Sequence, residues 1–465
     1  MPLITCRRLI PESCWLGAAC IAAWLLPHAA TAQSPSVAEY KSIQEALNAN
    51  PGKMVFVPAG DHLISERITI KADGSGLYGF GRIIQTNAEQ PIIRADKLKR
   101  VLLRDITLTR AEGKMDCRSE GIYLNQCEEV LLENVRVKDN RSPAASISVR
   151  EGKGTQIRGC TVENYMTLGV DDRTQSENYG YAFRCIDGTG IAVVDSEGNI
   201  IQNCRVIEHN FVPTQELKDK HGLGKFTKKN PQKGKLTSPE VWTAEYVNNW
   251  HQGSGIVVNG PQKNARSQLI GNQIENAAQG IDLHCDQVIV SNNIVNNAFI
   301  GMKAMHGSRN VLIIGNQFIK NDLWSIGLMP GAASHPSQPA TTDRPALEPN
   351  VDGGSIIANN IISDFGYGSA SWMWTGTSSC NPLRFDKGQT PQNPPLTDVI
   401  IQGNVIYDTG RDMPLVNGVP KREAPRYNYA VRIETDGKNA PKGLHVSGNI
   451  FHPGTSGVSN VELPP

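Results

Sequence analysis

Short runs of β-branched and aliphatic residues recur along the chain, separated by small and polar pairs that favour turns. Eight such segments align with one another: TQIRGCTVEN, NIIQNCRVIEHN, SQLIGNQIENA, QVIVSNNIVNNA, NVLIIGNQFIKN, GSIIANNIISDF, DVIIQGNVIYDT and GLHVSGNIFHPG. One shared position lies between the two runs of each segment and is held by Cys160, Cys204, Asn272, Asn293, Asn316, Asn360, Asn404 and Asn449. The pattern predicts pairs of short strands joined by tight turns.

The spacing of these segments predicts how the strands are arranged. From Asn272 onward, successive asparagines are 21, 23, 44, 44 and 45 residues apart. A period of about 22 residues is typical of one coil of a parallel β-solenoid, and the longer intervals are coils that carry loop insertions. We expect the equivalent asparagines to stack as a hydrogen-bonded ladder at the turn, which is a structural role.

The first part of the pattern, SIQEALNANPGKMVFVPAGDHLISERITI, predicts a helix followed by a strand. Ser42 and Glu45 have the spacing of a capping box. Ile43, Ala46 and Leu47 form one apolar helix face. A strand and a turn at 58–60 follow. Such a helix would cover the open end of the first coil.

The repeat and this entry segment together resemble the right-handed parallel β-helix of the pectate-lyase-like superfamily, over residues 36 to 455 approximately. The resemblance implies an all-β fold, a right-handed parallel β-helix (solenoid) with an N-terminal capping helix and long loop insertions. The cap would span about 36–70 and the coils about 71–455, within a single domain of residues 33–465. It also implies a carbohydrate-active protein that binds its substrate on an outer face of the solenoid.

The first 32 residues predict a secretory signal peptide. Arg7 and Arg8 precede an apolar stretch from Trp15 to Leu26, and the small residues Ala30 and Ala32 follow. The polar and Phe-Leu context of a twin-arginine signal is missing, which favours ordinary export with cleavage near Ala32. No later apolar run reaches the ~18 residues of a membrane helix. We therefore expect a periplasmic or secreted protein without a membrane partner.

Net charge and cysteine content limit the possible binding partners and the possible roles of the cysteines. The formal net charge is +1, so bulk charge attracts no particular partner, and nucleic acid is disfavoured by this neutrality and by export. The oligomeric state is left open. Seven cysteines follow the signal segment, an odd number without a C-x-x-C pair, which disfavours a structural zinc site. A loop disulfide between Cys117 and Cys127 is one possibility that spacing leaves open.

A second strand recurs in each coil as GIYL, SISV, GIVV, GIDL, GMKA and AVRI. Alternation places Asp282, His284 and Lys303 outward. It places their neighbours inward, namely Ile281, Leu283, Met302 and Ala304. Asp282 and Lys303 are one period apart and should be neighbours on adjacent coils, about 4.8 Å apart. The equivalent positions on other coils are Tyr123, Ser148, Val257 and Arg432.

Residues 279–284 also resemble the Tyr-Gly-Phe-Asp-Pro-His element of alginate C5-epimerases, with agreement at Gly280, Asp282 and His284. The resemblance implies that Asp282 and His284 belong to an active site. The Tyr, Phe and Pro of that element are replaced by Gln279, Ile281 and Leu283, so epimerase activity itself does not follow.

Elimination from a uronate, or epimerisation at its C5, needs a base for the proton next to the carboxylate and a cation for the resulting charge. His284 is the expected base, because a neighbouring carboxylate makes a lysine a poorer base. Lys303 and Arg309 are the expected charge stabilisers, Asp282 would orient one of them, and His306 is a further candidate. The alternative is that Asp282 and Lys303 form only a surface ion pair and that His306 and Arg309 lie on an ordinary turn.

Two insertions offer substrate-binding groups. The segment 218–235, KDKHGLGKFTKKNPQKGK, holds seven lysines and one aspartate and leads to Trp250 and His251. Trp372 and Trp374 lie on a later insertion, and Arg432 belongs to the outer face. A basic loop with aromatic residues suits an anionic glycan, although lysines also keep an insertion solvated.

Paired carboxylates leave a glycoside hydrolase open. The candidates are Asp171, Asp172, Asp187, Asp195, Glu197, Asp282 and Asp286. The polygalacturonase pattern is disfavoured, because Arg173 follows the Asp171–Asp172 pair and no Gly-His-Gly occurs. The same acids could hold Ca²⁺, as in many lyases of this fold, but no compact motif of oxygen ligands is present. A non-catalytic glycan-binding or structural solenoid is the third hypothesis.

Overall fold

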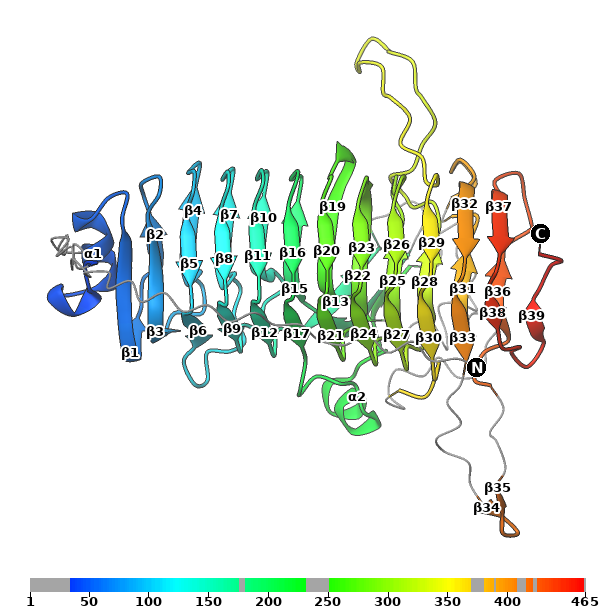
Figure 1. Ribbon diagram of the computed structural model, residues 1–465, viewed down its shortest axis with the longest axis horizontal. Helices are drawn as coiled ribbons and strands as arrows, with labels where there is room; N and C mark the ends of the chain where they lie inside the picture. Colours follow the sequence, from blue (N-terminus) through cyan, green and yellow to red (C-terminus); the bar gives the residue numbers. More distant parts are fainter. Residues whose placement is uncertain are drawn as a thin grey trace, which may run out of the picture. The chain divides into compact units, whose positions relative to one another are not determined.

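The computed structural model describes residues 34–174, 180–230, 251–368, 380–388, 390–407, 415–420 and 425–463. Residues from Pro35 onward form one compact unit. The expected signal peptide lies outside the described residues. The prediction of a parallel β-solenoid is confirmed, because each coil contributes up to three short strands and each strand pairs in parallel with its equivalents on neighbouring coils (Figure 1).

Three ladders of parallel strands run through the described chain. The first consists of β1 (Met54–Ile64), β3 (Gly76–Gln85), β5 (Leu102–Arg104), β8 (Leu131–Glu133), β11 (Gln156–Arg158), β16 (Ile200–Gln202), β20 (Gln268–Ile270), β23 (Ile289–Ser291), β26 (Leu312–Ile314), β29 (Ile356–Ala358), β32 (Thr397–Gln402) and β37 (Lys442–Ser447). The second continues from the end of β3 through β6 (Thr107–Arg110), β9 (Arg136–Lys138), β12 (Thr161–Glu163), β17 (Arg205–Ile207), β21 (Gln273–Glu275), β24 (Ile294–Asn296), β27 (Gln317–Ile319), β30 (Ile361–Ser363), β33 (Val405–Tyr407) and β38 (Ile450–Phe451).

The third ladder is a separate twelve-stranded sheet, and it carries the candidate site. Its strands are β2 (Ile68–Ile70), β4 (Ile93–Asp96), β7 (Ile122–Asn125), β10 (Ala145–Arg150), β15 (Thr189–Val194), β19 (Ser254–Asn264), β22 (Gln279–Asp286), β25 (Ile300–Ala304), β28 (Trp324–Leu328), β31 (Asn381–Phe385), β36 (Tyr429–Ile433) and β39 (Gly457–Ser459).

The core is a continuous column of inward side chains. In the twelve-stranded sheet one inward row reads Ile68, Ile93, Ile122, Ile147, Ile191, Ile256, Ile281, Met302, Ile326, Leu383 and Val431, and every member is buried. Burial of each such side chain contributes about 1.5–3 kcal/mol relative to its exposure. A single coil could not bury this row, so stacking of coils and formation of the core are one event.

The predicted asparagine ladder is confirmed. The amide of Asn293 donates to Oδ1 of Asn316 and to the carbonyl of Leu269, both at 2.9 Å. The same arrangement links Asn272 to Asn293 and continues through Asn360 to Asn404 and beyond. These buried polar groups are therefore fully partnered within the core.

The predicted cap is also confirmed. α1 (Ile43–Ala49) follows the 3-10 turn η1 (Val37–Glu39), and Ser42 accepts from the backbone N–H of Glu45 at 3.1 Å. Ile43, Ala46 and Leu47 are buried as expected. The turn expected at 58–60 is wrong: β1 runs through this segment, and its register with β3 shifts between Val57 and Gly60. A bulge absorbs the Pro-Ala-Gly sequence without ending the strand.

The disulfide that spacing left open, Cys117–Cys127, is not formed. Cys117 and Cys127 are both buried, each with a free thiol. Cys127 points into the core and its thiol contacts the carbonyl of Ala95 at 3.5 Å, whereas Cys117 lies near Asn140. The two side chains belong to different environments, so neighbouring positions in sequence do not bring their sulfur atoms together.

Insertions leave the coils between β12 and β19. β13 (Thr167–Asp172), β14 (Tyr181–Asp187) and β18 (Phe226–Lys229) form a small antiparallel sheet, and α2 (Gln215–His221) comes between β17 and β18 in the chain. Figure 1 shows α2 outside the stacked strands. A later hairpin is formed by β34 (Leu415–Val416) and β35 (Val419–Pro420). Among the described residues, no helix is both long and apolar enough to cross a membrane.

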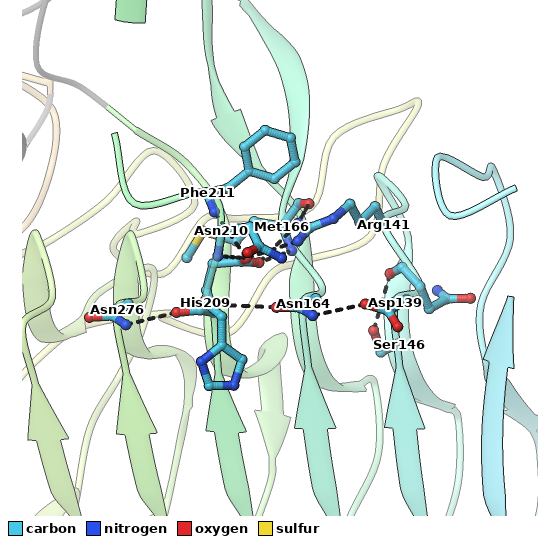
Figure 2. Close-up of polar contacts among 11 residues, drawn as sticks. Asp139, Arg141, Ser146, Asn164, Met166, His209, Asn210, Phe211 and Asn276 are labelled. Atoms are coloured by element: carbon cyan, nitrogen blue, oxygen red, sulfur yellow. Dashed lines mark hydrogen bonds and ion pairs between the residues drawn. The ribbon is translucent and has the colours of Figure 1, made fainter. Parts of the chain in front are cut away.

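A buried ion pair anchors the start of these insertions (Figure 2). Both guanidinium ends of Arg141 donate to Glu208 at 3.0 Å, and Arg141 also donates to the carbonyl of Met166. Glu208 in turn accepts the backbone N–H groups of Met166, Asn210 and Phe211. The carboxylate therefore fixes the chain where it leaves β12 and β17 for the insertions.

Candidate active site on the outer face of the twelve-stranded sheet

The strand register sets the outer row of the site. Asp282 on β22 pairs with Val257 on β19 and with Lys303 on β25, which confirms their expected neighbourhood. The same row contains the other positions expected from the repeat, namely Tyr123, Ser148 and Arg432, and additionally Arg94, Ala192, Gly327 and Arg384.

Asp282, His284 and Lys303 form one contact cluster. His284 Nε2 lies 2.8 Å from one oxygen of Asp282, and Lys303 Nζ lies 3.4 Å from the other. The two atoms of the His284 contact lie close together, but their geometry is not that of an aligned hydrogen bond. Although they lie on an outer face, Asp282 and Lys303 are only 6% and 8% exposed.

Two opposing effects act on the Asp282 carboxyl. Its burial raises the pKa, while the charges of His284 and Lys303 lower it, and the charges prevail, so the pKa lies well below the usual range. The group is therefore an anion at neutral pH, held between two nitrogen groups.

His306 adds a neutral imidazole to this cluster. Its ring lies edge-on to that of His284, with centroids 4.5 Å apart. Burial, together with the charges of His284 and Lys303, lowers its pKa to about 3, so the ring is uncharged at neutral pH. Its Nδ1 accepts the backbone N–H of Ala333 at 3.2 Å, which assigns the ring proton to Nε2. His306 therefore presents a donor.

The turn that carries His306 is held from below by a buried aspartate. Asp352 accepts the N–H groups of Gly307 and Ser308, both at 3.0 Å, and the hydroxyl of Ser334. Burial raises its pKa to about 7, against the effect of these hydrogen bonds. The amide of Asn350 bonds the carbonyl of His306 at 2.8 Å and that of Ala333 at 2.7 Å. His306 is thus fixed by the loop that follows β28.

Gly331 explains why that loop can approach so closely. A Cβ atom at this position would lie 2.2 Å from Nδ1 of His306. Only glycine leaves room for the imidazole here.

Arg309 lies beside the cluster and pairs with a different acid. Its guanidinium contacts Asp286 at 3.2 Å, and its side chain is 40% exposed. Of the two expected cations, Lys303 and not Arg309 contacts Asp282. Lys303 is therefore the cation that Asp282 could orient.

The hairpin β13–β14 contributes groups that the strand pattern did not single out. Arg173 pairs with Asp171 at 3.0 Å, and its charge contributes to the low pKa of His306. Gln252 donates to the other oxygen of Asp171 at 3.0 Å and accepts from Gln279 on β22 at 3.3 Å. In sequence, Arg173 appeared only as the residue that broke a polygalacturonase pattern.

The expected substrate-binding residues have different locations. Trp250, Trp372 and Trp374 lie outside the described residues. His251 is 1% exposed, its Nδ1 accepts the N–H of Ile186, and burial lowers its pKa to about 3. It therefore has no surface to offer a glycan. Arg432 lies in the outer row next to Arg384.

The lysine-rich segment is only partly a surface loop. Lys218 on α2 is partly buried, and burial lowers its pKa against the effect of Asp322. The residues after α2 form β18, whose Lys228 and Lys229 are exposed. Residues 231–235 lie outside the described residues.

Most of the candidate carboxylates have structural partners. Asp172 bonds Thr174, Glu197 pairs with Arg266 at 2.7 Å, and Asp286 pairs with Arg309. Asp187 differs: burial raises its pKa, and Asp171 on the paired strand adds to this effect. Asp195 lies just beyond β15 in a left-handed backbone conformation, with φ of 51°.

A calcium site does not fit the described residues. They contain no group of three or more His, Cys, Asp or Glu side chains arranged to hold a metal ion. The oxygens of Asp282 already face His284 and Lys303, and Ca²⁺ needs six to eight oxygen ligands.

The stacked coils and the outer-face cluster define a parallel β-helix protein with a buried ionisable site. Residues 102–223 match a family model described as a right-handed β-helix region, which supports the expected handedness. None of the curated proteins matches the chain in sequence.

Solved structures agree on the fold. The catalytic domain of a GH87 α-1,3-glucanase in complex with nigerose is 11% identical, with 92% of this chain and 68% of that chain covered and a TM-score of 0.54. PfbA, a surface adhesin of Streptococcus pneumoniae, is 12% identical, with 91% and 92% covered and a TM-score of 0.53. The mannuronan C-5 epimerase AlgE6 A-module of Azotobacter vinelandii is 14% identical, with 90% and 100% covered and a TM-score of 0.49. At these identities the first two similarities, whose TM-scores exceed 0.5, are similarities of fold.

Proposed function

We propose that this protein is an exported enzyme that acts on a uronate-containing polysaccharide by removing the proton at C5, as a lyase or an epimerase does. The observation that carries the proposal is the contact of Asp282 with both His284 and Lys303 on the outer face of a solenoid. Such a face is long enough to accommodate a polymer, and the cluster combines a base with cations.

In this proposal His284 is the base. With Nε2 towards the Asp282 carboxylate, Nδ1 is the nitrogen that takes the proton, and the carboxylate stabilises the imidazolium that forms. The side chain of His284 is 17% exposed, more than its partner Asp282 at 9%, so it is open to substrate. A buried carboxylate behind an imidazole therefore supplies both orientation and charge.

The cations and His306 complete the step. Lys303 and Arg173 are placed to balance the charge that develops on the substrate carboxylate when its α-proton leaves. In elimination the C5–H electrons form a C4=C5 double bond, the C4–O4 bond breaks, and O4 takes a proton. We assign His306 Nε2–H as a hydrogen-bond donor to O4, and the proton that O4 takes comes from water, because a neutral imidazole keeps its one ring proton. In epimerisation the C5 proton returns from the opposite face and no bond of the chain breaks.

The test is turnover of a panel of acidic polysaccharides by the mature protein. Ultraviolet absorbance of an unsaturated uronate together with new reducing ends indicates elimination. Altered C5 configuration by NMR, without new ends, indicates epimerisation. We expect His284→Gln to lower kcat by at least about 10²-fold, because general-base catalysis is typically worth 10²–10⁴-fold. Lys303→Met should cause a similar loss.

The matched control is His445→Gln on β37. This histidine is exposed on a different sheet, and its replacement should leave turnover unchanged. If His284→Gln, folded as judged by circular dichroism, retained full turnover, proton abstraction by this cluster would be wrong. If no acidic polymer is turned over but one is bound, the non-catalytic glycan-binding hypothesis replaces the enzyme.

One observation favours a glycoside hydrolase as the second candidate. Burial raises the pKa of Asp187, which lies on the same hairpin as Asp171, and a carboxyl with a raised pKa near a second carboxyl suits the general acid of a hydrolase. Under this alternative, reducing ends form without an unsaturated product. Asp187→Asn would then abolish the formation of reducing ends, whereas His284→Gln would not.

A further inference from the structure

A pocket on the outer row, away from the candidate active site, lies near the N-terminal end of the twelve-stranded sheet. It has a volume of about 400 Å³ and is lined by residues that include Arg67, Arg94, Arg150, Tyr123 and Glu120. Arg94 and Tyr123 occupy the same row as Asp282 on β22. We propose that this arginine pocket binds an acidic sugar residue of the same polysaccharide, an inference that rests on the proposed function.

The floor of the pocket is preorganised. The guanidinium of Arg94 donates to both oxygens of Asp96, at 2.6 and 2.9 Å, and lies 4.9 Å from the centroid of the Tyr123 ring. Asn125 donates to Asp96 at 3.2 Å and so holds the carboxylate in turn. Arg94 is therefore locked in place, while its side chain remains 35% exposed. A fixed guanidinium loses little conformational entropy when it binds a carboxylate.

The rim is preorganised as well, by a buried arginine beneath it. Arg110 is 4% exposed and donates to the carbonyls of Asn87, Gln90, Ser119 and Glu120, at 2.7 to 3.1 Å. Its Nε donates to Asn140 at 2.8 Å. One side chain thus ties two successive loops together, and these loops carry the pocket residues Gln90, Ser119 and Glu120. A rim held in this way is a built feature of the fold.

The chemistry of the lining indicates the occupant. Arg67 and Arg150 are exposed on either side of Arg94, and such guanidinium groups match the geometry of a carboxylate. Glu89 and Glu120 supply acceptors for hydroxyl groups, and Tyr123 offers a ring face to a sugar. Cations, acceptors and an aromatic ring together suit a hydroxylated acid, and a uronic acid residue has all three complementary features.

The position of the pocket places it on the path of the polymer. Five strand spacings of about 4.8 Å separate Arg94 from Asp282 in the row, which gives about 24 Å. The intervening residues are Tyr123, Ser148, Ala192 and Val257. Ser148 and Ala192 are small and nearly flush with the sheet, at 3% and 7% exposed. A chain bound at both ends could therefore lie along this row.

The experiment measures binding of oligouronates of graded length by calorimetry, in a His284→Ala background so that nothing is turned over. The double variant Arg67→Ala/Arg150→Ala, called the rim variant, removes the two exposed guanidinium groups beside Arg94. It leaves Arg94 and Arg110, with their internal hydrogen bonds, intact. The matched control is Arg136→Ala/Arg205→Ala, which removes two exposed arginines from β9 and β17 on another ladder. Carboxyl-reduced oligomers of the same length are the neutral probe.

We expect the rim variant to weaken binding of long oligouronates about tenfold, as the loss of a charge-assisted contact predicts. The control pair should bind like the parent, and the neutral oligomers should bind weakly to all three proteins. In the active background, KM for long chains should rise with kcat unchanged, and turnover of oligomers too short to span the row should not change.

The pocket assignment is overturned if the rim variant binds like the parent, if the control pair loses as much affinity, or if neutral oligomers bind as tightly as acidic ones. Its failure is distinguishable from failure of the proposed function. If His284→Gln loses turnover but the rim variant binds oligouronates like the parent, only the pocket assignment is wrong. If the rim variant loses oligouronate binding but the parent turns over no acidic polymer, only the proposed enzymatic function is wrong.

Discussion

At the scale of single residues, the ionisable groups of this protein owe their properties to burial. Asp282, His306 and Asp352 lie within one small region, yet burial raises the pKa of one carboxyl to about 7, while neighbouring cations lower that of the other. The same environment keeps His306 neutral. The pKa values of Asp282 and Asp352 thus shift in opposite directions, because only Asp282 has positively charged neighbours.

Asp352 gives a prediction for stability against pH. Its pKa is near 3.8 when unfolded and about 7 when folded, so the unfolded state releases its proton first as pH rises. Its contribution to stability is therefore present below about pH 4 and is lost between about pH 4 and 7, with a magnitude of roughly 2–4 kcal/mol. Asp352→Asn should flatten this slope in thermal unfolding measured across that range.

The control for this measurement is Asp343→Asn, an exposed carboxyl in the same loop. It should keep the wild-type slope. Equal pH slopes in wild type and Asp352→Asn would show that Asp352 does not titrate in this window.

The ion pair in Figure 2 gives a second prediction at this scale. Glu208 is fully buried and Arg141 is 6% exposed, so removing the carboxylate leaves a buried guanidinium without its counterion. Glu208→Ala should lower the free energy of unfolding by about 3–5 kcal/mol. Denaturant titration measures this, with Glu128→Ala, from the exposed pair with Lys99, as a control of little effect. A small effect at Glu208 would mean that the pair does not anchor the insertions.

At the scale of elements, the asparagine ladder shows how a turn repeats without distortion. Each amide bonds a strand carbonyl of the preceding coil and the next asparagine, so one side chain partners buried groups of two coils. The two cysteines at the start of the row have no side-chain amide. Cys204 joins the ladder only through its backbone N–H, which donates to Oδ1 of Asn272. Asparagine is therefore required where the row is continuous on both sides.

This arrangement makes Asn316→Ala costly. Loss of the side chain leaves the carbonyl of Val290 and the N–H of Asn293 buried without partners. At about 1–3 kcal/mol for each of the two groups, the free energy of unfolding should fall by roughly 2–6 kcal/mol in denaturant titration. Asn449→Ala, at the partly exposed end of the ladder, should cost clearly less because water can replace the amide. Equal costs at both positions would contradict the ladder as the source.

At the scale of the whole solenoid, stability depends on its ends as well as its coils. Strands within the stack are paired on both edges, whereas the first coil would expose its edge and its apolar interior without α1. Leu47 is 5% exposed at this contact. The cap therefore protects a surface that would otherwise bind further chains.

Replacing Leu47 by Asp tests this role. We expect a lower unfolding temperature and association of the protein, seen by light scattering, because a charge at this position detaches the helix from the coil. Asn48→Asp introduces the same charge on the exposed side of α1 and should change neither property. A monomeric Leu47→Asp protein with unchanged stability would mean that the helix does not protect the first coil.

What the sequence determined follows from periodicity. The period of two within strands identifies the inward rows, and the period of about 22 residues identifies which residues are neighbours on adjacent coils. The asparagine ladder, the capping helix and the pairing of Asp282 with Lys303 could therefore be predicted. The tertiary structure decided the rest. Arg173, His306 and Asp352 reach the site from a hairpin, a turn and a loop, whose paths no repeat specifies. Burial by these segments, which local patterns do not encode, sets the protonation of the site.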